Sequence, residues 1–134
     1  MAQLEKVEGI AGVYAAKLRA AGVKSTDALL NMGATPKGRQ EIEQNSGIAH
    51  KLILKWVNHC DLYRVRGVGA EYAELLAVSG VDTVPELAQR KAEHLRERMG
   101  EANRKKRCVR QLPTVTAVDR WIKQAKALPR VVRY

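Results

Sequence analysis

The sequence has no phenylalanine, and aromatic residues make up only 4% of its 134 residues. A core must therefore be built from Leu, Val, Ile and Ala, which suits closely packed helices. The two cysteines, Cys60 and Cys108, share no metal-ligand or redox spacing with each other or with the three histidines. We therefore expect two reduced intracellular thiols and no bound metal.

Long apolar runs are also missing. No stretch approaches the ~20 apolar residues that span a bilayer, and the first residues do not resemble a secretory signal. No expected helix combines a broad apolar face with a polybasic face, as binding to a membrane surface requires. We therefore expect a cytoplasmic protein without membrane contact.

The whole chain has a net charge of +10, and acidic residues are scarce near its C-terminal end. Residues 1–62 hold eight Lys or Arg against six Asp or Glu, and residues 63–103 hold six against seven. Residues 104–134 hold ten against one, so almost the whole excess lies in the last quarter. Such a field attracts polyanions such as nucleic acid, although a basic surface can also serve solubility alone.

The sequence repeats itself at a spacing of 58 residues. Residues 7–10 (Val-Glu-Gly-Ile) align without a gap with residues 65–68 (Val-Arg-Gly-Val), and the match continues for another helix. Farther on the register slips by seven residues, around the basic stretch, so that Trp56 corresponds to Trp121. We infer an internal duplication. Identical pairs are Gly9/Gly67, Tyr14/Tyr72, Ala15/Ala73, Leu18/Leu76, Gly22/Gly80, Val23/Val81 and Leu29/Leu87.

Glycine, threonine and proline mark helix ends in both repeats. Gly22 and Gly80 stand where a helix should end, because glycine accepts the left-handed conformation that closes the last turn. Thr83, with Glu86 three residues on, is typical of a capping box, and Thr35-Pro36 of an N-cap followed by a first helical proline. No alternating run predicts a strand. The helices expected cover about residues 12–21, 25–33, 36–46, 49–62, 70–79, 83–90, 92–107 and 114–127.

These elements predict an all-α fold of about eight short helices packed as one compact unit. No Pro/Gly/Ser-rich linker interrupts the chain between its repeats. The tail could lie back on the fold, or its two valines could serve as a docking strand for a partner. The parts are a first repeat (1–62), a second repeat (63–128) and a C-terminal tail (129–134).

The segment from Val65 to Leu76 resembles the helix-hairpin-helix motif of DNA repair and recombination proteins, in which an apolar-x-Gly-apolar-Gly turn joins two helices. Glycines permit a tight turn, and free amides at the start of the next helix favour an anion. The resemblance implies a hairpin that grips DNA phosphates through its backbone without reading the bases. The residues expected at this contact are Arg64, Arg66, Gly67, Val68, Gly69 and Ala70.

The first repeat carries a weaker form of this hairpin at Gly9, Ile10, Ala11 and Gly12. Alanine stands where the second glycine belongs, and glycine follows one position later, so we expect a degenerate hairpin with weaker phosphate contacts. The whole tandem arrangement resembles an uncharacterised bacterial family of tandem helix-hairpin-helix (SAM-like) proteins, known only as a domain of unknown function (DUF4332-like). That resemblance implies a fold strongly and a function weakly.

A dense cationic cluster lies at or just beyond the C-terminal end of a predicted helix. One or two positive charges would satisfy the negative end of the helix dipole, and five exceed that need, which favours a surface that tracks phosphates. Against this, Glu71 and Glu74 follow the second hairpin closely and would repel a phosphate. The cluster comprises Arg104, Lys105, Lys106, Arg107 and Arg110.

No metal-ligand spacing, phosphate-binding loop or nucleophile motif is found, so we expect no enzyme activity and no cofactor. Some glycosylases carry a helix-hairpin-helix followed by a catalytic Lys or Asp, but this chain is too short for their two-lobed pocket. The first hypothesis is sequence-independent binding of double-stranded or structured DNA by the hairpin amides and the basic C-terminal surface. The alternative is a protein–protein adaptor or scaffold that binds its partner through helical faces and the tail.

Overall fold

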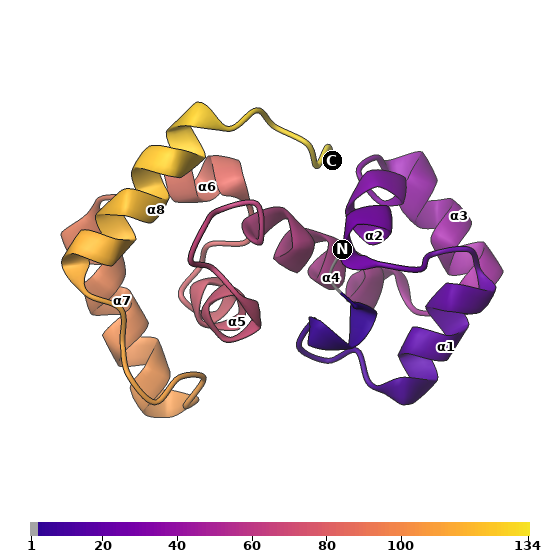
Figure 1. Ribbon diagram of the computed structural model, residues 1–134, viewed down its shortest axis with the longest axis horizontal. Helices are drawn as coiled ribbons and strands as arrows, with labels where there is room; N and C mark the ends of the chain where they lie inside the picture. Colours follow the sequence, from indigo (N-terminus) through magenta and orange to yellow (C-terminus); the bar gives the residue numbers. More distant parts are fainter. Residues whose placement is uncertain (1–2) are drawn as a thin grey trace. The chain divides into compact units, whose positions relative to one another are not determined.

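The computed structural model describes residues 3–134, which form eight α-helices, one short 3-10 helix and no strand (Figure 1). The predicted all-α chain of about eight short helices is confirmed, and every helix end lies within two residues of its expected position. Met1 and Ala2, at the start of the first predicted repeat, lie outside the described residues. The elements are η1 (Leu4–Lys6), α1 (Gly12–Ala20), α2 (Thr26–Met32), α3 (Pro36–Ser46), α4 (His50–Leu62), α5 (Ala70–Val78), α6 (Val84–Ala88), α7 (Ala92–Lys105) and α8 (Val115–Ala127).

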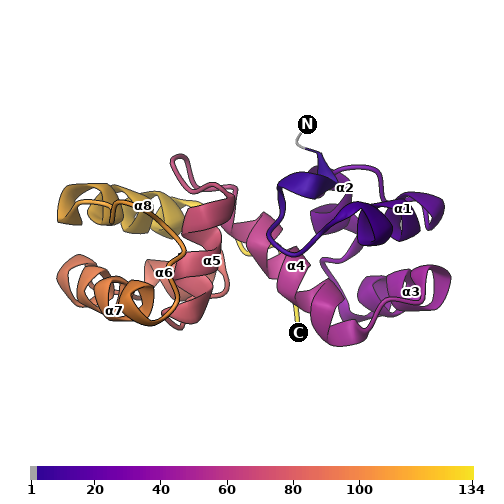
Figure 2. The ribbon, with the colours of Figure 1, turned by 90° about the horizontal axis from the view of Figure 1, so that it is seen from below.

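The chain forms two compact units. Unit 1 comprises Met1–Asp61 with Val131–Tyr134, and unit 2 comprises Leu62–Arg130. In unit 1, α1 packs against η1 and α3, and α2 packs against α3 (Figure 2). In unit 2, α8 packs against α6 and α7, and α5 packs against α7. Over residues 3–134, the structure has no helix with the length and apolar character needed to span a membrane.

The core of unit 2 is aliphatic, as the absence of phenylalanine requires. Trp121, 4% exposed, is the one aromatic side chain among its buried residues. Burial of each large aliphatic side chain stabilises the fold by roughly 1.5–3 kcal/mol. Fully buried members of this core are Leu62, Leu75, Leu76, Leu87, Leu95 and Met99.

Helix ends are closed in the same way in both repeats. Gly22 and Gly80 follow α1 and α5 with φ of +90° and +95°, as the sequence predicted. The amide of Val23 donates to the carbonyl of Leu18 at 2.8 Å, and the equivalent bond in the second repeat measures 2.9 Å. This is a Schellman motif, which reverses the chain and satisfies the last carbonyls of the helix.

The expected N-caps are present. Thr35 accepts a hydrogen bond from the amide of Gly38 at 3.1 Å, with a proline at the start of α3. Thr83 caps α6 by accepting from the amide of Glu86 at 3.4 Å. In a full capping box the Glu86 carboxylate would accept from the backbone amide of Thr83. Here it accepts instead from the Thr83 hydroxyl at 3.1 Å. The cap therefore fixes the start of α6 through one threonine.

In each repeat the last helix meets the glycine turn through a tryptophan. Gly9 and Gly67 have φ of +95° and +94°. A Cβ on Gly67 would lie 2.9 Å from Nε1 of Trp121, and a Cβ on Gly9 would lie 3.2 Å from Nε1 of Trp56. Both features demand glycine, because the left-handed backbone disfavours a side chain and the indole leaves no room for one.

The same indole rings also pack on the helix that follows each turn. Tyr14 of α1 lies against Trp56, and Tyr72 of α5 lies against Trp121, with ring centroids 5.1 Å apart in both pairs. The two pairs are tilted by 62° and 54°, in the range that aromatic rings favour. The duplicated sequence therefore folds into a duplicated glycine–tryptophan–tyrosine cluster.

We expect Gly67→Ala to lower the free energy of unfolding by about 2 kcal/mol, because it adds both backbone strain and a clash with Trp121. Urea denaturation followed by circular dichroism measures the change. Gly12→Ala is the control, because no atom lies within 4 Å of a Cβ there and its φ is not positive. Equal destabilisation by the two substitutions would contradict this account.

The two thiols are expected to differ in reactivity. Burial, together with the charges of Asp27 and Asp61, raises the pKa of Cys60 to about 12. At pH ~8 this thiol stays protonated in the folded protein, whereas Cys108 is half-buried. A thiol reagent should modify Cys108 first and Cys60 only after denaturation. The Cys108→Ser variant isolates the slow thiol, and rapid modification of that folded variant would refute the prediction.

Candidate functional site

The turn between α4 and α5 presents its backbone to solvent. Arg66, Gly67 and Gly69 are exposed, Ala70 is half-buried, and Val68 turns inward at 5% exposure. Gly69 caps α5 without a side-chain hydrogen bond. Across residues 3–134, no acceptor is found for the amides of Gly67, Gly69 and Ala70. Because a helix N-terminus carries partial positive charge, this turn is suited to an anion.

Helix α8 holds the turn in place. Gln124 accepts from the amide of Arg66 at 2.9 Å and donates to the carbonyl of Arg66 at 3.2 Å. Together with the packing of Trp121 beneath Gly67, these bonds fix the backbone and leave the Arg66 side chain exposed. Arg64, the other arginine predicted to flank the turn, is half-buried, and its Nη2 atom is shielded from solvent. Arg66 is therefore the better placed of the two.

The cationic stretch is folded, although its part beyond Lys105 lies outside a helix. Helix α7 ends at Lys105, two residues earlier than expected, and Lys106 has an extended backbone. The Asn103 side chain accepts from the amides of Cys108 and Val109 at 2.8 and 3.1 Å, and it donates to the Val109 carbonyl at 3.1 Å. Residues 106–114, here named the basic loop, are thereby folded back against the end of α7.

The basic loop lines two hollows that share Tyr72 and Gln111, and the glycine turn lines one of them. One hollow, of about 690 Å³, lies between the first turn of α5 and the basic loop. The second, of about 580 Å³, lies between the turn, the basic loop and α8. We refer to them as the paired hollows. Their charged residues are Arg66, Arg107, Arg110, Arg120 and Glu71.

The paired hollows favour an anion. Four arginines line them against one carboxylate, that of Glu71, which is exposed in the first turn of α5. Arginine presents a planar fork of donors that suits phosphate oxygens, and backbone amides add uncharged donors. Such an arrangement can hold a phosphodiester strand by its backbone.

The remaining members of the predicted cluster lie elsewhere. Lys106 Nζ forms an ion pair with the Glu74 carboxylate at 2.8 Å. Glu74 is only 5% exposed, so the expectation that it would repel an incoming phosphate is wrong. Arg104 and Lys105 are exposed in the last turn of α7 and line neither hollow. Of the predicted cluster, Arg107 and Arg110 line a hollow with Glu71 and Tyr72 of the first turn of α5.

The turn of the first repeat has nearly the same backbone. Gly9, Ala11 and Gly12 are exposed, and Ile10 is buried at 3%. Ala11 has φ −92° and ψ −179°, close to the −101° and −166° of Gly69, so alanine fits this position without strain. What the first repeat lacks is the basic loop, because the seven extra residues of the second repeat fall there.

Sequence reasoning had assigned no phosphate-contact role to Tyr72, Gln111 and Gln124. Tyr72 had a signal, since it is one of the residues identical in both repeats. Gln111 had none, because it lies in the loop that only the second repeat contains. The contact of Gln124 with Arg66 joins residues 58 positions apart, and no local pattern reports such a pairing.

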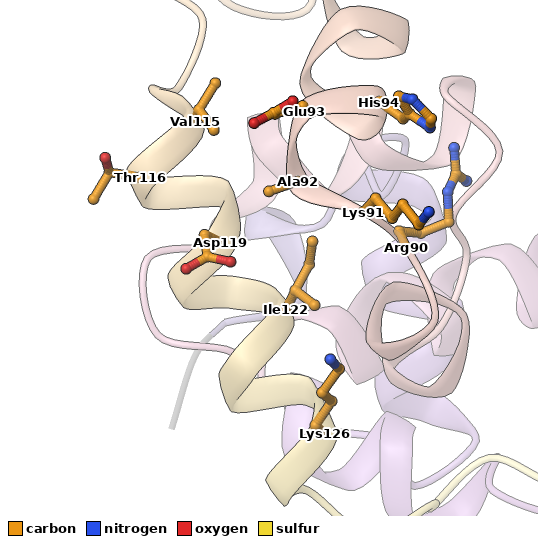
Figure 3. Close-up of a pocket in the computed structure, with 10 residues that line it drawn as sticks. All are labelled: Arg90, Lys91, Ala92, Glu93, His94, Val115, Thr116, Asp119, Ile122 and Lys126. Atoms are coloured by element: carbon orange, nitrogen blue, oxygen red, sulfur yellow. The ribbon is translucent and has the colours of Figure 1, made fainter.

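A third hollow, of about 620 Å³, lies between the start of α7 and α8 (Figure 3). It combines Arg90, Lys91 and Lys126 with the carboxylates of Glu93 and Asp119, so its charge is more nearly balanced. Asp119 also pairs with Lys123 of the same helix at 3.0 Å. Among residues 3–134 no group of three His, Cys, Asp or Glu side chains could hold a metal ion.

Comparison with known proteins identifies the family to which the chain belongs. No curated protein and no solved structure matches the chain significantly. A family described as a domain of unknown function, DUF4332, matches residues 8–128. This range runs from the first glycine turn to the residue after α8, so it includes both repeats. The chain therefore belongs to the DUF4332 family.

Proposed function

We propose that this protein is a non-enzymatic DNA-binding protein of the helix-hairpin-helix type, which holds duplex or structured DNA without reading its sequence. The observation that supports this most is the composition of the paired hollows. Gly67 of the glycine turn lines one hollow together with Arg66 and Arg120, and Arg107 and Arg110 line the other, with Glu71 as the one acid among the lining residues.

The chemistry of the donors favours a sugar-phosphate backbone over base edges. Amides at a helix start and arginines beside them recognise phosphate oxygens, which are the same at every base pair. Fixing the turn in advance, through Gln124 and Trp121, reduces the ordering cost of binding. Release of counterions from the DNA supplies most of the affinity in such a contact, so binding should weaken steeply with salt.

Two observations reduce the objections to this function. The carboxylate of Glu74 is buried and paired with Lys106, so it does not act at the turn. The adaptor alternative relied in part on a tail that is available to a partner. Residues 131–134 instead contact unit 1, where Arg39 donates to the carbonyl of Arg133 at 2.8 Å.

Charge reversal in the basic loop should separate local contact from net charge. We expect Arg107→Glu with Arg110→Glu to weaken binding to a random duplex by about 30-fold or more, and to lower the salt slope by about two. The control, Arg104→Glu with Lys105→Glu, changes the net charge equally but lies outside the paired hollows. It should weaken binding by about fivefold or less.

Fluorescence anisotropy with a labelled duplex, measured at about 50 and about 200 mM salt, tests this directly. Equal losses in the two double variants would mean that net charge alone attracts the DNA. A wild-type protein that fails to bind the duplex at the lower salt would overturn the proposed function.

Removal of the one acid in the paired hollows should have the opposite effect. We expect Glu71→Gln to strengthen duplex binding by about threefold at low salt, because an exposed carboxylate beside the turn repels phosphate. Glu93→Gln, in the first turn of α7, is the matched control outside these hollows. The same anisotropy titration measures both, and an equal gain in the control would contradict a contact at Glu71.

A further inference from the structure

Residues 131–134 lie in unit 1 and form neither helix nor strand. The amide of Arg133 donates to the carbonyl of Ala34 at 2.7 Å. The carbonyl of Arg133 accepts from Nη2 of Arg39 at 2.8 Å. Val132 is buried at 2% exposure. Both backbone polar groups of Arg133 are thus used, while its side chain remains exposed.

The terminal tyrosine adds two further contacts. Its hydroxyl donates to Oδ1 of Asn58 at 2.9 Å, and Asn58 is itself buried at 8% exposure. Its ring lies over the guanidinium of Arg39, with 5.8 Å between the guanidinium carbon and the ring centroid. A cation held over an aromatic face is attracted by the electrons of the ring.

Arg39 makes contacts with both Arg133 and Tyr134, and it is unusual for an arginine because it is buried. It is 3% exposed, and burial lowers its pKa because the charged form loses hydration. Nη1 donates to the carbonyl of Gly33 at 2.8 Å, and Nη2 donates to the tail. Nε is buried and has no acceptor among residues 3–134. A buried guanidinium needs partners for its donors, and the tail supplies one carbonyl and one aromatic face.

We propose that unit 1 contains a binding site for a short peptide segment, anchored by Arg39, and that residues 131–134 of the same chain fill it. The site recognises the backbone of Arg133, the buried Val132 before it and the tyrosine after it. It does not read the exposed side chain of Arg133. This inference is independent of DNA binding.

The site makes unit 1 depend on the far end of the chain. Without the tail, the Nη2 donor of Arg39, the Asn58 amide and the pocket of Val132 would be uncovered together. The same contacts would accept an identical tail from a second copy, because exchange of an identical element requires no new chemistry. An added peptide of the same sequence should therefore compete with the attached tail.

The first test uses a chain that ends at Arg130 and a synthetic peptide of residues 129–134. We expect saturable binding by calorimetry and a rise in melting temperature of about 5 °C or more on saturation. A peptide with Tyr134→Ala should bind at least about tenfold more weakly, and one with Arg133→Ala equally well. The full-length protein should bind at least about tenfold more weakly than the shortened chain, because its own tail fills the site.

The second test begins with substitutions in the 134-residue chain, and this part of it does not depend on the shortened chain folding. Val132→Ala and Tyr134→Ala should each lower the melting temperature, whereas Arg133→Ala should leave it within about 1 °C. Arg39→Met in the shortened chain should abolish peptide binding. Equal stability of the chains with and without residues 131–134, or equal effects of Tyr134→Ala and Arg133→Ala, would overturn the proposal.

Discussion

The structure depends most on the contact between a tryptophan and a glycine turn, which occurs once in each repeat. In the second repeat, Trp121 of α8 lies so close to Gly67 that a Cβ there would approach its Nε1 to 2.9 Å. The contact requires glycine at this position of the turn. It also packs the last helix of the repeat against the glycine turn and keeps the backbone of that turn facing outward. Tyr72, packed on the same indole, extends this support into the first turn of α5.

The candidate site combines the glycine turn, which both repeats contain, with positive charges that only the second repeat carries beside it. Both repeats have the turn, but only the second has the inserted basic loop, which Asn103 ties down through three hydrogen bonds. This loop carries Arg107 and Arg110 to the hollow beside the turn. The proposed function therefore assigns the second repeat to phosphate binding, even though Ala11 is compatible with the backbone of the first turn.

The buried charges show how local fields are balanced in this basic chain. Glu74, at 5% exposure, is paired with Lys106, so one cation of the basic stretch serves the fold. Arg39, at 3% exposure, instead relies on carbonyl oxygens and the ring of Tyr134. In both cases desolvation makes a partner necessary, and the partner lies far away in sequence.

The sequence by itself determined the helices, their ends and the duplication, because these rest on local signals. Gly22, Gly80 and Thr35 act within one helical turn. The spacing of apolar residues indicates which face of a helix is buried, whichever element packs on that face. Only the tertiary structure decided that Arg107 lines a hollow with the first turn of α5 while Lys106 pairs with Glu74. Such pairings join groups dozens of residues apart, and they follow from the path of loops whose sequence has no periodicity.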